Sequence, residues 1–579
     1  MRIALFLLAV SGLFAQQNID SYFERLFDTF LAHDPQGKSA TGLFEPNDQL
    51  NDVSPKALLR IHREKIAMLE KLQQYELDSL TPEQQISHRV FSWMRDYMVA
   101  DEKYLFHAYR VNQMFGILNE LTFVFTQFHR LETQKDVDLY ISRLAKIPKQ
   151  LEQTIELMKH QRKLGVVPPA FTIEKVIQII QKSTPASIEE NALYSHLASR
   201  DVDPAQLAKA ARVMQTQVYP AYQKLSDYLA ALLKEGVKNQ GVWALPDGDN
   251  YYAHVLRYHT TTDLTPDEIH AIGFEQIAQI QQEMRSVLAD LGLSDPDKTV
   301  GELVAQLAKD PQFYFSNDEE GRQECLKKYE AILARCREQL YPLFDLRPDV
   351  SVAITPVPAH EQEGTAGAYY LPPSLDRSRP GTFYANMGNM KEVPMYTMET
   401  LTIHEAEPGH HFQIALQNEM NIPTLRKLES GFTAYVEGWA LYAEKLAYEQ
   451  GFYSSPSARL GHLQAELLRA VRLVVDTGIH SKRWTREQAI ETMQKTTGLH
   501  LGTVTREVER YFVYPGQACS YKIGQLKILE LRKRAQLALG DRFDIRQFHN
   551  VVLKTAAAPL TVLEENIDKY IIDEKSPFF

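Results

Sequence analysis

His404-Glu405-Ala406-Glu407-Pro408-Gly409-His410-His411 is the segment around which the rest of the chain can be interpreted. It follows a helix-like run and gathers three of the chain's 18 histidines and two carboxylates. Imidazole and carboxylate side chains bind Zn²⁺ and transfer protons near neutral pH. The segment is therefore the first candidate for a metal site, and it is expected to lie on a helix.

The spacing of these histidines departs from the usual helical zinc motif. In that motif a His-Glu pair is followed one turn later by a second His, and the Glu acts as general base. Here the second ligand would fall at Pro408. On a straight helix His410 lies about 9 Å along the axis from His404, and His411 about 10.5 Å, too far to share a metal whose Zn–N bonds are about 2.0–2.1 Å.

Two interpretations of this departure remain open. Pro408 and Gly409 favour a local bulge in which two extra residues loop out, and this bulge would return His410 to the ligand position. Alternatively, the helix ends at Glu407 and is followed by a Pro-Gly turn with two surface histidines.

A second predicted helix supplies a possible third ligand. The segment from Ser430 to Glu444 carries aromatic and aliphatic residues at three-to-four spacing, and Gly451 is a plausible stop. Glu437 lies on this helix and could complete a His₂Glu set with one zinc position open. Glu444 is two turns further along the same face, so it is either an alternative ligand or the partner that orients a histidine.

These residues resemble a large bacterial family that is mostly catalogued as a domain of unknown function. The resemblance rests on three motifs and covers nearly the whole mature chain. The motifs are His404-Glu405-x-x-Pro408-Gly409-His410-His411-Phe412-Gln413, Glu437-Gly438-Trp439-Ala440 and Tyr514-Pro515-Gly516-Gln517-Ala518-Cys519-Ser520-Tyr521-Lys522-Ile523-Gly524.

That family in turn resembles the helical gluzincin peptidases, among them Taq-type carboxypeptidase, thimet-type oligopeptidases and angiotensin-converting enzyme. The resemblance implies that His404, His410 and Glu437 bind zinc and that Glu405 is the base. It leaves the choice between His410 and His411 open.

An oxyanion donor is also expected, because hydrolysis of an amide builds negative charge on the attacked carbonyl. Resemblance to the helical gluzincins points to Tyr521 and His480 for this role. Tyr514 is the runner-up, and it would otherwise contact substrate. Arg506, Arg510 and Lys522 carry the positive charge that could hold a substrate carboxylate. A lone His or Tyr is, however, more often a structural core residue.

The fold is expected to be mainly α, a large helical body with a cleft and a small β-sheet near the metal helix. Capping boxes at Thr81, Thr265 and Thr485 mark helix starts. Residues 16–250 form an N-terminal helical region, and residues 251–579 form the region with the zinc site. Short β-rich segments lie between about residues 350 and 390.

This sheet could offer a free edge to an extended peptide. The edge would be Gly364 to Tyr370 or Thr382 to Asn386, with Tyr369 and Tyr370 shaping side-chain pockets. The alternative is a structural hairpin that covers the core.

The N-terminus has the pattern of a signal peptide. Met1 and Arg2 precede an apolar run that ends at Ala15, so residues 1–15 are expected to be cleaved and the protein to be periplasmic or secreted. No Cys follows the run, so no lipid anchor is expected.

The composition narrows the function class. A net charge of −11 with dispersed Lys and Arg argues against nucleic-acid partners, and no later apolar stretch reaches membrane-spanning length. The three cysteines, Cys325, Cys336 and Cys519, imply no disulfide framework.

The sequence therefore predicts a metallopeptidase with one zinc ion per chain, acting on peptide substrates. Two other functions remain open, a zinc amidohydrolase acting on another amide and a non-catalytic periplasmic binding protein.

Overall fold

The computed structural model describes residues 18–237, 239–359, 362, 367–428 and 431–575, and it confirms a mainly α fold with one small sheet. The predicted signal peptide, Ser430 and Gly364 lie outside the described residues. Thr81 and Thr265 begin helices α4 (Pro82–Asp101) and α13 (Pro266–Asp290) with complete capping boxes, and Thr485 caps α21 (Arg486–Thr497). None of the described helices has the length and apolar character that crossing a bilayer requires.

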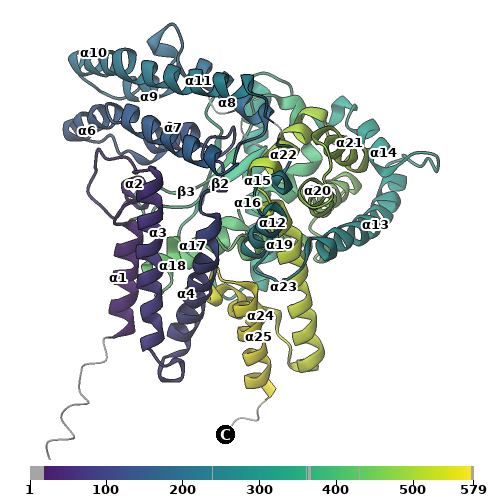
Figure 1. Ribbon diagram of the computed structural model, residues 1–579. Helices are drawn as coiled ribbons and strands as arrows, with labels where there is room; N and C mark the ends of the chain where they lie inside the picture. Colours follow the sequence, from purple (N-terminus) through teal and green to yellow (C-terminus); the bar gives the residue numbers. More distant parts are fainter. Residues whose placement is uncertain (1–17, 238, 360–361, 363–366, 429–430, 576–579) are drawn as a thin grey trace, which may run out of the picture.

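The helices form several packed layers (Figure 1). An upper layer on the N-terminal side has its own hydrophobic core. Its helices are α5 (Ile117–Phe123), α6 (Gln134–Leu144), α7 (Ile147–Lys163), α8 (Ala170–Ser183), α9 (Ala192–Ala198), α10 (Pro204–Val213) and α11 (Tyr219–Lys234).

The largest core combines helices from both sides of residue 250. Its N-terminal contributors are α1 (Ile19–Leu31), α3 (Pro55–Glu70) and α4, and α2 (Pro35–Thr41) lies beside them. The others are α12 (Gly248–Thr260), α18 (Thr424–Leu428), α19 (Thr433–Glu449), α23 (Gln517–Leu539), α24 (Ile545–Thr555) and α25 (Leu560–Lys575). Figure 1 shows the yellow C-terminal helices beside α4.

A third core lies around the long helix α20 (Pro456–His480), which packs along α13. Helices α14 (Val300–Leu307), α21 and α22 (Leu501–Val513) complete this layer.

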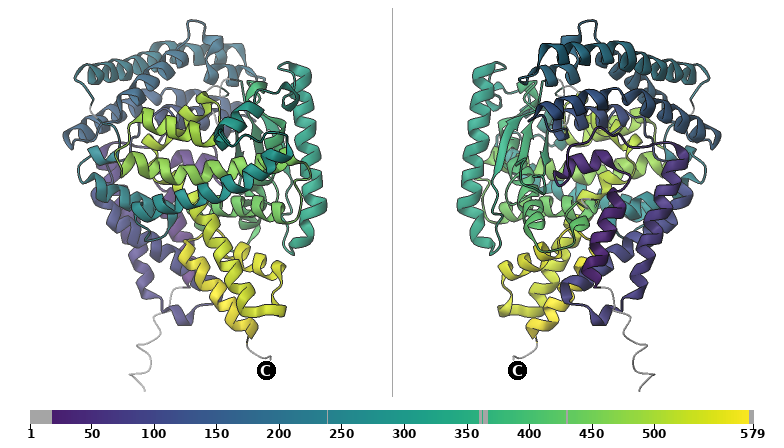
Figure 2. Two further views of the ribbon diagram at one scale, coloured as in Figure 1. Left: turned by 90° about the vertical axis from the view of Figure 1, so that its right-hand side faces the viewer. Right: turned by 90° about the vertical axis from the view of Figure 1, so that its left-hand side faces the viewer.

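The small sheet packs against the long helix α15 (Glu319–Leu340) (Figure 2). Its strands are β1 (Val352–Pro356), β2 (Ala368–Leu371) and β3 (Gly381–Ala385), in the order β1-β3-β2. Strand β3 pairs parallel with β1 and antiparallel with β2.

This order corrects one prediction. Thr382 to Asn386 cannot be the free edge, because β3 is the central strand and its backbone groups are used on both sides. Strand β2, with Tyr369 and Tyr370, is an edge strand among the described residues, and it packs beside α16 (Met398–Glu405).

Two motif glycines decide how closely α19 and α23 cross. A Cβ at Gly524 would lie 1.8 Å from the carbonyl oxygen of Ala434, and a Cβ at Gly438 would lie 2.5 Å from the carbonyl carbon of Gly524. Only glycine permits this approach. Glu437 directly precedes Gly438 on α19, so this close crossing also sets where α19 holds Glu437.

Candidate metal centre

A short loop replaces the regular helix between the two candidate histidine ligands. Helix α16 ends at Glu405 and α17 (His410–Glu419) begins at His410. The loop turns sharply at Ala406 (ψ −102°) and Gly409 (ψ −128°), and a Cβ at Gly409 would lie 2.1 Å from two carbonyl oxygens of α16. Residues Ala406 to Gly409 thus leave the helical path, as the bulge interpretation predicts.

The alternative interpretation, a turn with surface histidines, is wrong. His410 is 8% exposed and His411 is fully buried. The loop is held from the facing helix, because Trp439 Nε1 donates a hydrogen bond to the Pro408 carbonyl oxygen at 2.8 Å. The loop is therefore buried because α19 packs against α17 and against the loop that precedes it.

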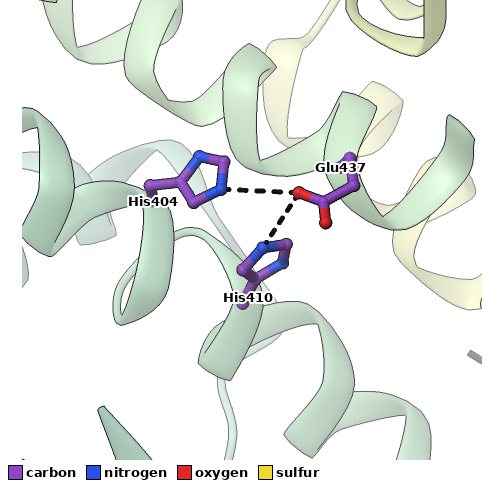
Figure 3. A group of neighbouring side chains, drawn as sticks. All are labelled: His404, His410 and Glu437. Carbon is purple, nitrogen blue, oxygen red and sulfur yellow. Dashed lines mark ion pairs between the residues drawn. The ribbon is translucent and has the colours of Figure 1, made fainter. Parts of the chain in front are cut away.

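The loop brings His404 and His410 together opposite Glu437 (Figure 3). Glu437 Oε2 lies 3.4 Å from His404 Nε2 and 3.2 Å from His410 Nε2. One ligand atom from each residue lies within 4.8 Å of the others. The Glu437 side chain is 16% exposed, so solvent reaches the cluster.

The donor set fits a zinc ion. Ligand atoms at about 2.0–2.1 Å from a tetrahedral zinc lie about 3.3 Å from one another, close to the separations from Glu437 Oε2. Glu437 Oε2 is buried, and within the described residues it has no hydrogen-bond donor other than the imidazoles of His404 and His410. Two imidazoles and one carboxylate also leave a fourth position open, as catalytic zinc sites do.

Charge in the cluster favours an ionised carboxylate. Burial alone would raise the pKa of Glu437, but His410 and His404 outweigh burial and hold the pKa well below its usual range. A carboxylate that stays ionised at neutral pH is a better metal ligand than a carboxylic acid.

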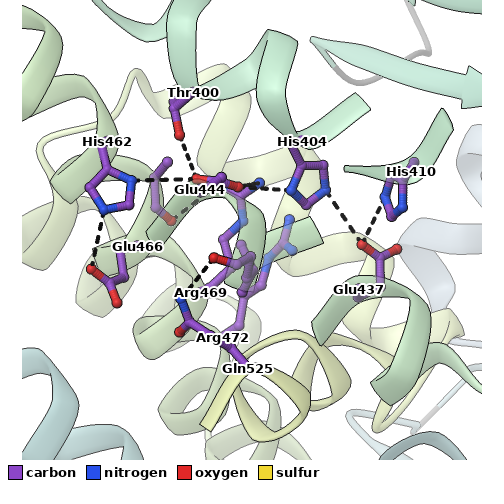
Figure 4. A network of polar contacts seen from close by, with 12 residues as sticks. Thr400, His404, His410, Glu437, Glu444, His462, Glu466, Arg469, Arg472 and Gln525 are labelled. Carbon is purple, nitrogen blue, oxygen red and sulfur yellow. Dashed lines mark hydrogen bonds and ion pairs between the residues drawn. The ribbon is translucent and has the colours of Figure 1, made fainter. Parts of the chain in front are cut away.

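Glu444 orients His404 from the opposite side (Figure 4). Its Oε1 lies 2.8 Å from His404 Nδ1, and Thr400 Oγ1 donates to Oε2 at 2.5 Å. Nδ1–H therefore points at Glu444, and Nε2 is directed toward Glu437 and the shared ligand position. Of the two roles predicted for Glu444, this geometry matches the orienting one.

The position of His404 between two carboxylates also affects its protonation. Burial lowers the pKa of His404, but its hydrogen bonds with Glu437 and Glu444 outweigh burial and raise that pKa to about 9. In the absence of a metal the ring is thus protonated, and metal binding would release this proton.

Behind Glu444 lies a buried polar network that the sequence reasoning missed. His462 lies 3.7 Å from Glu444 and 3.8 Å from Glu466, and Lys522 Nζ lies 2.8 Å from both Glu466 and Gln525. The i,i+4 spacing of His462 and Glu466 on α20 was the available signal.

His411, the alternative ligand, faces away from the cluster. Its Nε2 lies 2.9 Å from the Val350 carbonyl oxygen, and its Nδ1 lies 3.0 Å from the Tyr370 hydroxyl. Both ring nitrogens therefore have partners, and the geometry selects His410 over His411.

Glu407 also has a structural role that its place in the motif did not reveal. It accepts two hydrogen bonds from Arg337, at 2.7 and 2.9 Å, and one from the Tyr341 hydroxyl at 2.5 Å. These contacts fasten the loop to α15.

The expected base Glu405 is the last residue of α16 and is 7% exposed. Its carboxylate has no hydrogen bond or ion pair with any other described residue. It is therefore available for proton transfer beside His404.

Tyr521, one of the expected oxyanion donors, lies beside His404. Its ring is parallel to the His404 ring, at an interplanar angle of 8° and a centroid distance of 6.5 Å. Burial, together with the charge of Glu437, raises the pKa of Tyr521 to about 12, so the hydroxyl keeps its proton at neutral pH.

Burial raises the pKa of Tyr514, and the negative charge of Glu437 raises it further. Its ring meets the rings of Phe115 and His259 edge-on, at 5.4 and 4.9 Å. These ring contacts place Tyr514 beside α12, which carries His259.

His480 is not free to act as an oxyanion donor. Its Nδ1 accepts from the Val242 backbone N–H at 3.2 Å, and its Nε2 lies 2.9 Å from the Tyr511 carbonyl oxygen. Asp476, one turn earlier, accepts hydrogen bonds from Tyr252 and Gly516. Both residues join helix α20 to its neighbours, as buried polar groups in cores do.

The two tyrosines of β2 have different surroundings. Tyr370 contacts His411, and Tyr369 stacks on Tyr384 of β3 at 4.8 Å. A hollow of about 330 Å³ between the upper N-terminal layer and the β2–β3 connection contains none of the cluster residues. A cleft above the cluster stays a prediction.

Comparisons with known proteins cover nearly the whole chain. A family model described as "Bacterial protein of unknown function (DUF885)" matches residues 35–567. One matching solved structure is described as a "putative lipoprotein from Colwellia psychrerythraea"; it has a TM-score of 0.92 and 32% identity, and the match covers 96% of this chain and 99% of that chain.

Another matching structure is described as a "putative lipoprotein of unknown function from Shewanella oneidensis". It has a TM-score of 0.71 and 19% identity, and the match covers 94% of this chain and 98% of that chain, so it shows the shared fold. No curated protein matches the sequence.

Proposed function

The chain belongs to the DUF885 family of bacterial proteins, and we propose that it is an exported zinc-dependent peptidase that hydrolyses short peptides. One observation carries the proposal, the convergence of His404 Nε2 and His410 Nε2 on Glu437 Oε2 at 3.4 and 3.2 Å. A binding protein would have no need of a carboxylate such as Glu405, which has no hydrogen-bond or ion-pair partner among the described residues, beside this cluster.

The roles of the chain's own residues follow from their surroundings. When bound, Zn²⁺ would polarise the carbonyl of the bond to be cleaved and activate water. The Glu405 carboxylate takes a proton from the attacking water and delivers it to the leaving amine nitrogen. The Tyr521 hydroxyl, which stays protonated, donates a hydrogen bond to the negative charge that develops on the carbonyl oxygen.

The edge strand β2 supports a peptide as the substrate. An extended peptide could pair with the side of β2 that faces away from β3 and would then lie beside α16, which carries His404 and Glu405. Tyr369 would contact substrate side chains in this arrangement. Tyr370 would instead support the strand, because its hydroxyl contacts the buried His411.

Two observations support an exported location. The apolar run that ends at Ala15 has the pattern of a signal peptide. The related Colwellia protein, at 32% identity, is described as a "putative lipoprotein", and lipoproteins are exported.

The test measures metal content and peptide hydrolysis on the same preparation. We expect about one zinc ion per chain by mass spectrometry and cleavage products from a mixed peptide library. Glu405→Gln should keep the zinc and lower kcat by about 100-fold or more. Glu399→Gln is the matched control, because Glu399 lies on the same helix but pairs with Arg335 at 2.6 Å.

Each other outcome identifies a different function. Failure to retain zinc, even after purification without chelators and incubation with zinc, would contradict the proposal and favour a binding protein. Bound zinc with cleavage of other amides but no peptides would indicate an amidohydrolase. Full peptidase activity in Glu405→Gln would mean that Glu405 is not the base.

A further inference from the structure

Two buried arginines beside Tyr521 share a single carboxylate. Glu507 Oε2 accepts hydrogen bonds from Arg472, at 2.8 and 3.1 Å, from Arg510 at 3.2 Å, and from the Tyr511 hydroxyl at 2.9 Å. Arg472 and Arg510 are each 7% exposed. Arg510 Nη1 also donates a hydrogen bond to Gln517 Oε1, which carries no charge. Within this hydrogen-bonded group one carboxylate faces two guanidinium ions, so the group keeps a surplus positive charge away from bulk water.

Arg472 also has an unused donor. Within the described residues its Nη1 is buried and has no hydrogen-bond partner. Its guanidinium carbon lies 4.4 Å from the centre of the Tyr521 ring, a cation–π contact that partly offsets burial but does not satisfy the N–H groups. A buried charged donor without an acceptor is costly, and such exceptions call for a ligand or another explanation.

The other cations near the site already have acidic partners. Lys522 lies 2.8 Å from Glu466, and Arg506 lies 3.0 Å from Glu392. Of the three cations that the sequence suggested for a substrate carboxylate, only Arg510 belongs to a group with surplus charge. The structure adds Arg472, which the sequence reasoning did not consider.

This surplus charge lies next to the candidate metal centre. Tyr521 links the two, because its ring is 6.5 Å from the His404 ring and 4.4 Å from the Arg472 guanidinium carbon. The Arg472 guanidinium carbon therefore lies no farther from the centre of the His404 ring than the sum of these two distances. An extended peptide spans that length in about three residues. Glu507 and Tyr521 are partly exposed, so solvent reaches the edge of this group, while the two guanidinium groups themselves stay buried.

We propose that Arg472 and Arg510 form a subsite for a carboxylate of the peptide substrate, held within about three residues of the bond that is cleaved. This inference rests on the proposed peptidase function and specifies its substrates. A planar guanidinium fork matches a carboxylate bidentately, and Nη1 of Arg472 gains its missing acceptor. The carboxylate belongs either to the C-terminus of a short peptide or to an acidic side chain.

Binding of four peptides tests the subsite and distinguishes these sources. The full chain with Glu405→Gln, in buffer containing zinc, is titrated by calorimetry with N-acetylated pentaalanine as the free acid and as the amide. The second pair is the amidated peptide with a central Glu or Gln. We expect the free acid to bind about tenfold or more tightly than its amide, or the Glu peptide about tenfold more tightly than the Gln peptide.

Variants assign the preference to the arginines. Arg472→Gln and Arg510→Gln should each remove most of the preference, and Arg472→Lys should keep part of it. Arg459→Gln is the matched control on the same helix, because Arg459 pairs with Asp290 and is 38% exposed. If one Gln variant does not fold, the other and the four-peptide comparison still decide.

The outcomes separate this inference from the proposed function. Equal affinity for all four peptides, or an unchanged preference in both Gln variants, would overturn the subsite. Equal affinities together with cleavage by the wild-type chain would leave the peptidase intact. A carboxylate preference without any cleavage would support the subsite and contradict the peptidase.

Discussion

Glu444 Oε1 lies 2.8 Å from Nδ1 of His404, on the side of the ring opposite to Glu437. This contact fixes the tautomer and the direction of the candidate ligand atom Nε2. We therefore expect Glu444→Gln to lower zinc affinity by roughly 10–100-fold while the chain remains folded. Competition with a chromophoric chelator measures the affinity.

The control for this prediction lies on the same helix. Glu449→Gln removes a carboxylate from α19 that pairs with Arg532 at 2.8 Å and lies outside the network. It should leave zinc affinity unchanged. Wild-type affinity in Glu444→Gln would show that Glu444 does not orient His404.

The neighbouring histidines are expected to respond differently to substitution. His410→Ala should lower zinc affinity by about 100-fold or more, because it removes one of three candidate ligands. His411→Gln should retain one zinc but lose about 1–3 kcal/mol of stability, because His411 contacts Val350 and Tyr370 in the core. Zinc stoichiometry and urea denaturation of both variants check the pair. Loss of zinc in His411→Gln alone would reverse the assignment.

The residues of the His₂Glu cluster could be predicted from the sequence because the segments that carry them follow local rules of helix formation. Pro408 and Gly409 predict a break in the helix from their backbone restrictions alone. The aromatic spacing around Glu437 predicts the second helix. Periodicity predicts which face of that helix is buried, but not which element packs against it. The family resemblance was needed to predict that Glu437 faces the two histidines.

The remaining contacts depend on tertiary packing. Arg472 and Glu507 lie on different helices, and no local pattern relates them. The same holds for Lys522 and Glu466, which pair only because α20 packs against α23. Strand order is equally non-local: β3 is short and β-rich, like an edge strand, and only its two partners reveal that it is central.

The close crossing of α19 and α23 makes a sharp prediction for Gly524. A Cβ there would lie 1.8 Å from the Ala434 carbonyl oxygen, so the helices must separate. We expect Gly524→Ala to lose about 3 kcal/mol or more of stability and to weaken zinc binding, because α19 also carries Glu437. Urea denaturation and chelator competition measure the two effects.

Gly502 offers a matched control within a helix. A Cβ at Gly502 would meet only side-chain atoms, the nearest at 3.3 Å. Gly502→Ala should leave stability unchanged or raise it by up to about 1 kcal/mol. An equal response of the two variants would mean that the crossing does not require glycine.

Asp476 should make stability depend on pH. It accepts hydrogen bonds from the Tyr252 hydroxyl at 2.6 Å and the Gly516 N–H at 3.0 Å, but burial outweighs them and raises its pKa to about 7. An unfolded chain titrates near 3.9, so between about pH 4 and pH 7 the folded chain binds the proton more tightly and stability falls as pH rises. Asp476→Asn cannot ionise. Relative to wild type, its free energy of unfolding should therefore increase by roughly 3 kcal/mol from pH 5 to pH 8 in urea denaturation.

Asp267→Asn is the control for this prediction. Asp267 is exposed, and its pKa is lowered, mainly by its hydrogen bond with Lys482, so this variant should show no such increase. A constant difference between Asp476→Asn and wild type at both pH values would mean that Asp476 is already ionised in the folded protein at pH 5.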